Sequence, residues 1–194
     1  MQLFFNQIDK LKRYWKLKPK EVKGVLISIL VVAFAISFGK WGIGDEVNIP
    51  VGLTNLLLSI IIVSITLLGR LFAQKFVAMG ADYRAQYRMW SFGLLLILVV
   101  AFLINGNQKL WLLLPLIPGG IVINYMPGHR LGWVRYGLNV FGIGVASLAG
   151  PIANILMAMI FKILFTIFQL EIFYTAFVLN LVWAIWNMLP NSAS

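Results

Sequence analysis

The 194-residue sequence contains no cysteine, a single histidine and only six acidic residues. Without cysteine, the chain cannot form disulfides, iron–sulfur clusters or zinc sites made of thiolates, although this absence indicates no particular compartment. The single histidine, His129, excludes a metal site built from several histidines. Charged residues make up 11% of the chain and hydrophobic residues 61%, a composition that cannot cover a water-soluble domain. These shortages predict an integral membrane protein.

Long hydrophobic runs recur along the chain. A hydrocarbon core about 30 Å thick requires roughly 20 apolar residues per helix. We therefore expect an all-α, polytopic helical membrane protein with about six transmembrane segments. The expected segments are residues 25–38 extended to 43, 51–68, 91–104, 111–123, 138–161 and 172–189. Residues 1–23 form a basic N-terminal segment, and residues 24–194 form a single transmembrane domain.

Two of the expected segments are irregular. Residues 111–123 contain two prolines and two glycines, which predicts a broken or re-entrant segment; if it does not cross, five crossings remain. The apolar run 138–170 is longer than one bilayer, but each side of Gly150-Pro151 is too short to cross alone. We expect one tilted or kinked helix there, with Lys162 reaching outward at its end.

Basic residues predict the orientation in the membrane. Seven Lys and Arg residues lie in the first 23 positions, and most of the others lie in the connections 70–88 and 126–137. These segments should be cytoplasmic, so both termini are expected inside, and the membrane is expected to be the cell membrane. Phe4, Ile8, Leu11 and Trp15 recur at helical spacing and favour an interfacial helix, with a solvated tail as the alternative. The formal charge of +10 is assigned to an anionic cytoplasmic leaflet, and no nucleic-acid partner is expected.

Two short patches within the apolar runs combine helix breakers with amides. Ala146 and Gly150 have the spacing that permits close helix approach, and Pro151 follows. Asn154, one turn after Gly150, needs a hydrogen-bond partner in lipid, where an unpaired amide is costly. The second patch joins Asn187 to Pro190 at a membrane boundary, where simple helix termination is the alternative explanation.

Taken in order, these patches resemble the site-2 protease family of intramembrane zinc metalloproteases, most closely its short archaeal-type members. That family carries HExxH on an early helix, Gly-Pro-x-x-Asn on a middle helix and Asn-x-x-Pro-x-Pro-x-Leu-Asp-Gly on a late one. Residues 75–84 and 88–90 resemble the segment that follows HExxH, 148–155 resemble the middle patch, and 187–190 match the opening of the late motif. The resemblance implies a site-2 protease-like core and a zinc cofactor.

The residues at the metal-binding positions depart from the family pattern. The alignment places residues 70–74 at HExxH, so Arg70, Leu71 and Gln74 replace both histidines and the glutamate base. Arg70 offers no lone pair, Leu71 offers no basic atom, and Gln74 offers at most one weak amide oxygen. The aspartate ligand would fall beyond Ser194. We therefore expect no catalytic residues, no metal ligands and no cofactor.

Other hydrolytic sites are not indicated by the residues available. His129 lies beside Arg130 in an expected cytoplasmic connection, which is typical of a surface histidine. No serine has a histidine or lysine at an evident partnering position. An aspartyl site needs two acids within membrane spans, and the expected spans contain none.

These observations leave three classes of function. The preferred one is a noncatalytic pseudoprotease that binds or sequesters transmembrane protein segments. The alternatives are an active intramembrane zinc metalloprotease whose ligands are altered or truncated, and a small-solute carrier or structural membrane protein. Candidate residues of the substrate-binding cleft are Arg70, Gln74, Gly150, Pro151, Asn154, Asn187 and Pro190. Arg70 and Gln74 share a helix face, from which they can bind an unwound peptide or a lipid phosphate; alternatively, Arg70 snorkels from the end of its span.

Overall fold

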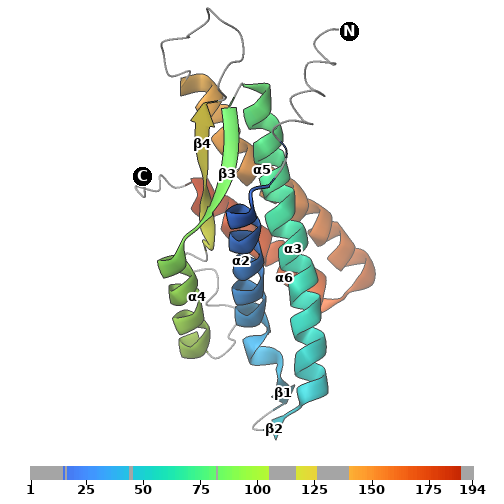
Figure 1. The fold of residues 1–194 in the computed structure, drawn as a ribbon. Coiled ribbons are helices and arrows are strands. Elements are labelled where there is room, and N and C mark those ends of the chain that lie inside the picture. Colours follow the sequence, from blue (N-terminus) through green and yellow to red (C-terminus); the bar gives the residue numbers. More distant parts are fainter. Residues whose placement is uncertain are drawn as a thin grey trace, which may run out of the picture.

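The computed structural model describes residues 15, 17–43, 46–81, 83–104, 117–125 and 140–188 (Figure 1). Most of these residues are helical, and short strands lie between the helices. The elements in chain order are α2 (Pro19–Ser37), the 3-10 helix η1 (Phe38–Lys40), β1 (Gly42–Ile43), β2 (Glu46–Val47), α3 (Ile49–Gly80), β3 (Tyr83–Met89), α4 (Ser91–Ile104), β4 (Gly119–Tyr125), α5 (Val140–Phe168) and α6 (Glu171–Met188).

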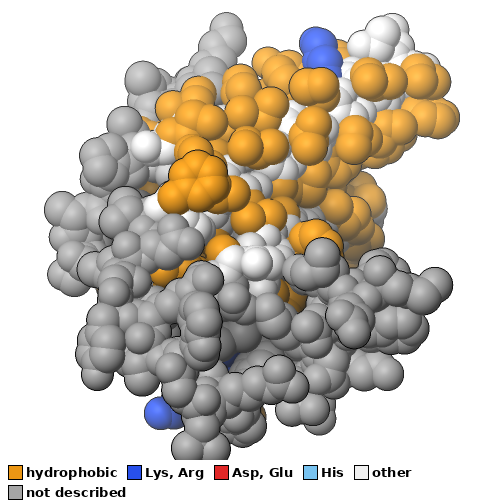
Figure 2. Space-filling model, turned by 90° about the horizontal axis from the view of Figure 1, so that it is seen from above, with side chains coloured by type: hydrophobic (Ala, Val, Ile, Leu, Met, Phe, Trp, Pro, Cys, Tyr) orange, Lys and Arg blue, Asp and Glu red, His pale blue; other side chains and the backbone are white. Residues whose placement is uncertain are grey.

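Four helical stretches in the described residues are long and apolar enough to cross a membrane, by length and composition. They are α2 with η1, α3, α5 and α6. Helix α4 has the expected bounds, but its 14 residues span only about 21 Å, which is less than a hydrocarbon core of about 30 Å. Figure 2 shows hydrophobic side chains over much of the described surface on one face, with few Lys or Arg side chains among them.

The described residues are mostly helical, as expected, but they also contain strands, one of which includes the end of the segment 111–123 that was expected to be broken or re-entrant. Residues 119–123 lie in β4, which pairs antiparallel with β3 and places Tyr87 opposite Ile121; residues 111–116 lie outside the described residues. Strands β1 and β2 pair antiparallel as a second short two-stranded sheet. Strand β3 alternates buried and less buried residues, as expected for a strand with one face against the helices. It occupies part of the connection 70–88 that the sequence analysis treated as a loop.

Helix α3 extends well beyond the expected span 51–68. The Asn48 side chain accepts a hydrogen bond from the Val51 N–H at 3.3 Å and caps the N-terminus, and the helix ends at Gly80. Its 32 residues measure about 48 Å, so α3 exceeds the thickness of a hydrocarbon core. The positions aligned with HExxH therefore lie inside a continuous helix, and β3 folds back alongside it (Figure 1).

Helices α5 and α6 form a helical hairpin. Helix α5 continues through Pro151, which confirms the expectation of one helix across this long apolar run. Two residues connect it to α6, and the first of them, Gln169, has a left-handed φ of 56°. Lys162 is exposed near the end of α5, and its Nζ lies 5.4 Å from the ring centroids of Phe165 and Phe177.

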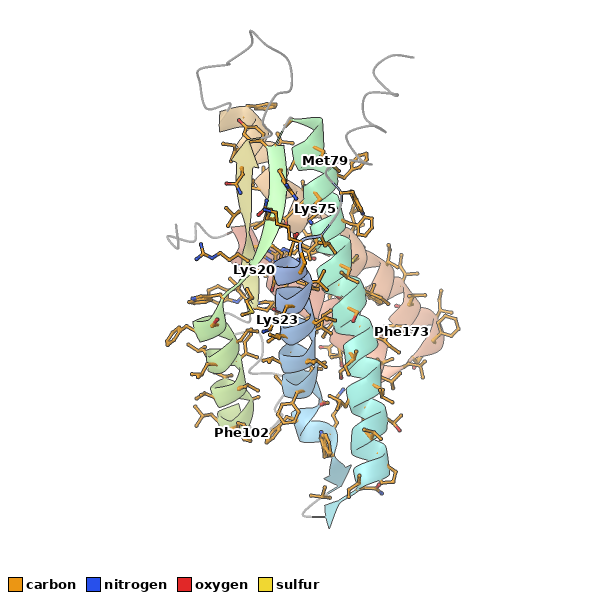
Figure 3. The ribbon with its side chains drawn as sticks, in the orientation of Figure 1. Lys20, Lys23, Lys75, Met79, Phe102 and Phe173 are labelled. Atoms are coloured by element: carbon orange, nitrogen blue, oxygen red, sulfur yellow. The ribbon has the colours of Figure 1, made fainter. Side chains whose placement is uncertain are left out.

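A buried ion pair joins the first turn of α2 to α3 and β3. Lys75 Nζ lies 2.7 Å from Glu21 Oε1, and the side chains are 8% and 4% exposed. The same carboxylate oxygen accepts a hydrogen bond from the Tyr87 N–H at 2.9 Å, and Oε2 accepts one from the Lys18 N–H at 3.3 Å. Figure 3 shows Lys75 on α3 at the level of β3. Glu21 therefore fixes the strand against both helices.

Candidate functional site in the helix interior

A stripe of buried polar side chains runs along one face of α3. Thr66, Arg70 and Gln74 follow at four-residue spacing, which places them on the same helix face, and all three are buried. Helix α5 contributes the buried Asn154, and α6 contributes the buried Asn180. We call these five residues the polar interior site.

Gln74 packs against the Gly150-Pro151 sequence of α5, which offers both space and a free backbone carbonyl. Proline has no N–H, so Pro151 leaves the carbonyl of Ser147, four residues earlier, without its helical donor. Gln74 Nε2 donates a hydrogen bond to this carbonyl at 3.3 Å. A side chain at Gly150 would overlap the Gln74 carboxamide. Gly150 therefore permits the approach of Gln74, and Pro151 supplies its acceptor.

Arg70 and Asn154 lie at the same level of this helix pair. Gln74 contacts Gly150, and a Cβ at Gly69 would lie 2.8 Å from Met157 Sδ, so α3 and α5 run antiparallel. Arg70 falls between the two contacts on α3, and Asn154 falls between them on α5. Facing positions in such a pair are separated by a typical interaxial distance of about 8–10 Å, which long side chains bridge.

The polar atoms at this level are largely unpaired. Arg70 is 4% exposed and Asn154 is 0% exposed. Among the described residues, Arg70 Nε and Nη1 and both polar side-chain atoms of Asn154 have no hydrogen-bond partner. Arg70 is thus enclosed by the protein, and the alternative that it snorkels from the end of its span is wrong.

Asn180 extends the site by one helical turn. Its Nδ2 donates to Thr66 Oγ1 at 3.0 Å and to the Ala176 carbonyl at 2.8 Å. Its Oδ1 has no partner in the described part of the chain. Thr66 lies one turn from Arg70, so the amide of α6 joins the same interior stripe.

The buried Tyr87 of β3 lies near Arg70. Its hydroxyl lies 2.7 Å from Ser28 Oγ of α2. Burial raises the pKa of the Tyr87 phenol above its ordinary value, whereas the hydrogen bond with Ser28 and the charge of Arg70 act in the opposite direction. A phenol with a raised pKa is neutral near pH 7, so Tyr87 lies near Arg70 without neutralising its charge.

The structure brings some of the sequence-predicted residues together and separates others. Gln74 and Gly150 meet where α3 contacts α5, next to Pro151, and Arg70 and Asn154 are buried one turn farther along their helices. The buried Leu71 packs in the apolar core. Asn187 donates to the Trp183 carbonyl of its own helix, as in simple helix termination. His129 and Pro190, and most of the predicted interfacial helix, lie outside the described residues.

The sequence analysis missed Thr66, Asn180 and Tyr87. The sequence contained a hint of the first two. Thr66 lies one helical turn before Arg70, and Asn180 is a lone amide in an apolar run, so it needs a hydrogen-bond partner in lipid just as Asn154 does. The sequence contained no such hint of Tyr87, because its place depends on an unexpected strand.

The residues aligned with HExxH do not fit zinc. A guanidinium offers only donors, leucine offers no ligand atom, and Gln74 offers only one weak amide oxygen. The described residues contain no group of three or more His, Cys, Asp or Glu side chains that could hold a metal ion. What the arrangement offers instead is hydrogen bonding, with amide and guanidinium groups held inside an apolar core.

Comparisons with protein-family models, curated proteins and solved structures found no match for this chain. The resemblance to site-2 proteases therefore rests on the residues and spacings quoted above.

Proposed function

We propose that this protein is a noncatalytic relative of site-2 proteases that binds or sequesters transmembrane segments of other proteins. The observation that carries the proposal is the contact of Gln74 with Ser147 and Gly150. Gln74 is aligned with the last position of HExxH, and Gly150 belongs to the Gly-Pro-x-x-Asn patch, so this contact supports the proposal. The polar interior site is the place where a bound segment is held.

The unpaired groups of the site support binding rather than a purely structural role. Polar side chains within membrane helices are costly and mark functional sites by default. Gln74 Oε1 and both polar atoms of Asn154 lack partners among the described residues. An unwound stretch of a bound segment has free N–H and C=O groups that match these acceptors and donors. Binding thus satisfies groups on both sides.

In this proposal, the protein resides in the cell membrane with both termini in the cytoplasm. The C-terminal end of α3 and the end of the β3–β4 sheet at Tyr83 and Tyr125 then face the cytoplasm, and the β1–β2 sheet faces outward. Anionic lipids of the cytoplasmic leaflet are the surrounding partner.

Cross-linking from single cysteines tests the binding site, because the natural chain has no cysteine background. We would prepare Ala153→Cys, which neighbours Asn154 and is half-buried, and Ile152→Cys, which is exposed on α5. Each variant in nanodiscs is oxidised with a single-span peptide that carries one cysteine. We expect the Ala153→Cys variant to cross-link preferentially, because a segment held at the site passes beside Asn154.

The same preparations separate the alternative functions. The proposal expects far less than one zinc per chain by mass spectrometry and no cleavage of the peptide. About one zinc per chain together with cleavage would establish the active metalloprotease instead. Equal cross-linking of both variants, combined with solute uptake by proteoliposomes, would favour the carrier.

A further inference from the structure

Arg70 is a buried cation without a counter-charge in the described part of the chain. Helix α3 buries two cations five residues apart, and only Lys75 has a carboxylate partner there. Arg70 Nε and Nη1 have no hydrogen-bond partner among the described residues. An isolated buried charge is strongly unfavourable, so this guanidinium requires an acceptor.

The acidic side chains of the described helices do not supply that acceptor. Glu21 is engaged by Lys75 and by the N–H groups of Tyr87 and Lys18. Glu171 is the first residue of α6, more than two turns before Asn180. Because Asn180 bonds to Thr66, one turn from Arg70, Glu171 lies well away from Arg70 along the helices. The acceptor for Arg70 must therefore come from outside these helices.

The chemistry around Arg70 favours a carboxylate as that acceptor. A guanidinium binds carboxylates and phosphates through parallel hydrogen bonds, and the amide of Asn154 at the same level adds another donor. Leu67 and Leu71 flank Arg70 on α3, and both belong to the apolar core. A carboxylate on a short side chain fits such surroundings better than a lipid phosphate, which brings a headgroup and two acyl chains with it.

We infer that Arg70, assisted by Asn154, binds the carboxylate of an aspartate or glutamate within the transmembrane segment that the protein holds. This inference rests on the proposed function and specifies its partner. An acidic residue is costly at the centre of a membrane helix. Pairing with Arg70 relieves the cost for both chains, so acidic segments are selected over purely apolar ones.

Binding of matched peptides to the protein in nanodiscs of neutral lipid tests the inference. The peptides are single-span Leu/Ala helices that carry Asp, Asn or Leu at one position, moved by one residue at a time through a central turn. For the best-placed position, we expect the Asp peptide to bind about tenfold or more tightly than its Asn counterpart, as for a charge-assisted hydrogen bond. Arg70→Met should abolish the difference, and Arg70→Lys should retain part of it. The matched control is Arg88→Met, which removes an exposed arginine of β3 and should leave the difference unchanged.

The outcomes separate this inference from the proposed function. If Asp, Asn and Leu peptides bind equally at every position, segment binding stands but the carboxylate site is wrong. If none of the peptides binds, the proposed function fails and the inference fails with it. If Arg70→Met instead abolishes thermal stabilisation by phosphatidylglycerol, with no effect on peptide selection, the acceptor is a lipid phosphate and the inference is overturned.

Discussion

Two buried cations on α3 have opposite surroundings. Lys75 meets the Glu21 carboxylate at 2.7 Å, and that carboxylate accepts two further backbone N–H groups. Arg70, little more than one turn away, lies near Tyr87, and its Nε and Nη1 have no acceptor in the described residues. The first region is internally satisfied and holds α2, α3 and β3 together. The second keeps unsatisfied groups inside the same core, which costs stability and is typical of a binding site.

The largest effect is expected from breaking the satisfied pair. Lys75→Met leaves the Glu21 carboxylate buried without its cation, and should lower the free energy of unfolding by about 3–5 kcal/mol. Tryptophan fluorescence during SDS titration in mixed micelles measures the loss. The double variant Glu21→Gln/Lys75→Met should recover much of it, since both charges are then absent. If the double variant is no more stable than Lys75→Met, the ion pair does not account for the loss.

Replacing the second cation, Arg70, by methionine should raise the free energy of unfolding instead of lowering it. Arg70→Met removes a charge with no described partner and keeps much of the side-chain volume, so we expect a gain of about 1–3 kcal/mol in unfolding free energy without peptide. The SDS titration used for Lys75→Met checks the sign. A loss as large as that of Lys75→Met would show that Arg70 already has a counter-charge within the free protein.

A smaller loss of unfolding free energy is expected at Gln74, and its size should depend on Pro151 of α5. Gln74→Leu removes the donor to the Ser147 carbonyl and should cost about 1 kcal/mol. In a Pro151→Ala background, the new N–H at position 151 can bond this carbonyl, so the same substitution should cost less. A double-mutant cycle on unfolding free energies measures this coupling. Strict additivity would mean that Gln74 does not replace the missing helical donor.

The smallest effect is expected from the hydrogen bond between α3 and α6. Thr66→Val removes the hydroxyl that accepts from Asn180 Nδ2, which keeps its bond to the Ala176 carbonyl. We expect a loss of about 0.6 kcal/mol in unfolding free energy, the average for such bonds between membrane helices. Thr166→Val is the matched control, because Thr166 is exposed and bonds only within its own helix among the described residues. Equal effects of the two substitutions would contradict a specific contribution from Asn180.

Hydropathy alone predicted the long helices, because lipid leaves a chain of this composition few alternatives. The starts of α5 and α6, and the continuation of α5 through Pro151, agree with the sequence analysis to within two residues. The pairing of β3 with β4 was missed because Arg84 and Arg88 interrupt the apolar pattern of β3, and because β4 begins with two glycines. Strand pairing depends on distant partners that a local pattern does not contain.

The candidate site was predicted only in part for a similar reason. The spacing of the motifs predicted Gln74 and Gly150 as candidate cleft residues, and the structure shows them in contact. The burial of Arg70 was not predictable from its neighbours in sequence, because an arginine after an apolar run usually marks the end of a span. Its enclosure depends on α3 continuing to Gly80 and on β3 returning to place Tyr87 beside it.

The two-residue link at Gln169 has a consequence for biogenesis. Because only two residues separate α5 from α6, we expect the two helices to enter the bilayer together as one helical hairpin. Asn154 and Asn180 therefore arrive at the same moment, after α3 has already been synthesised. Until then, the polar stripe of α3 has to be shielded by the insertion machinery or by lipid headgroups.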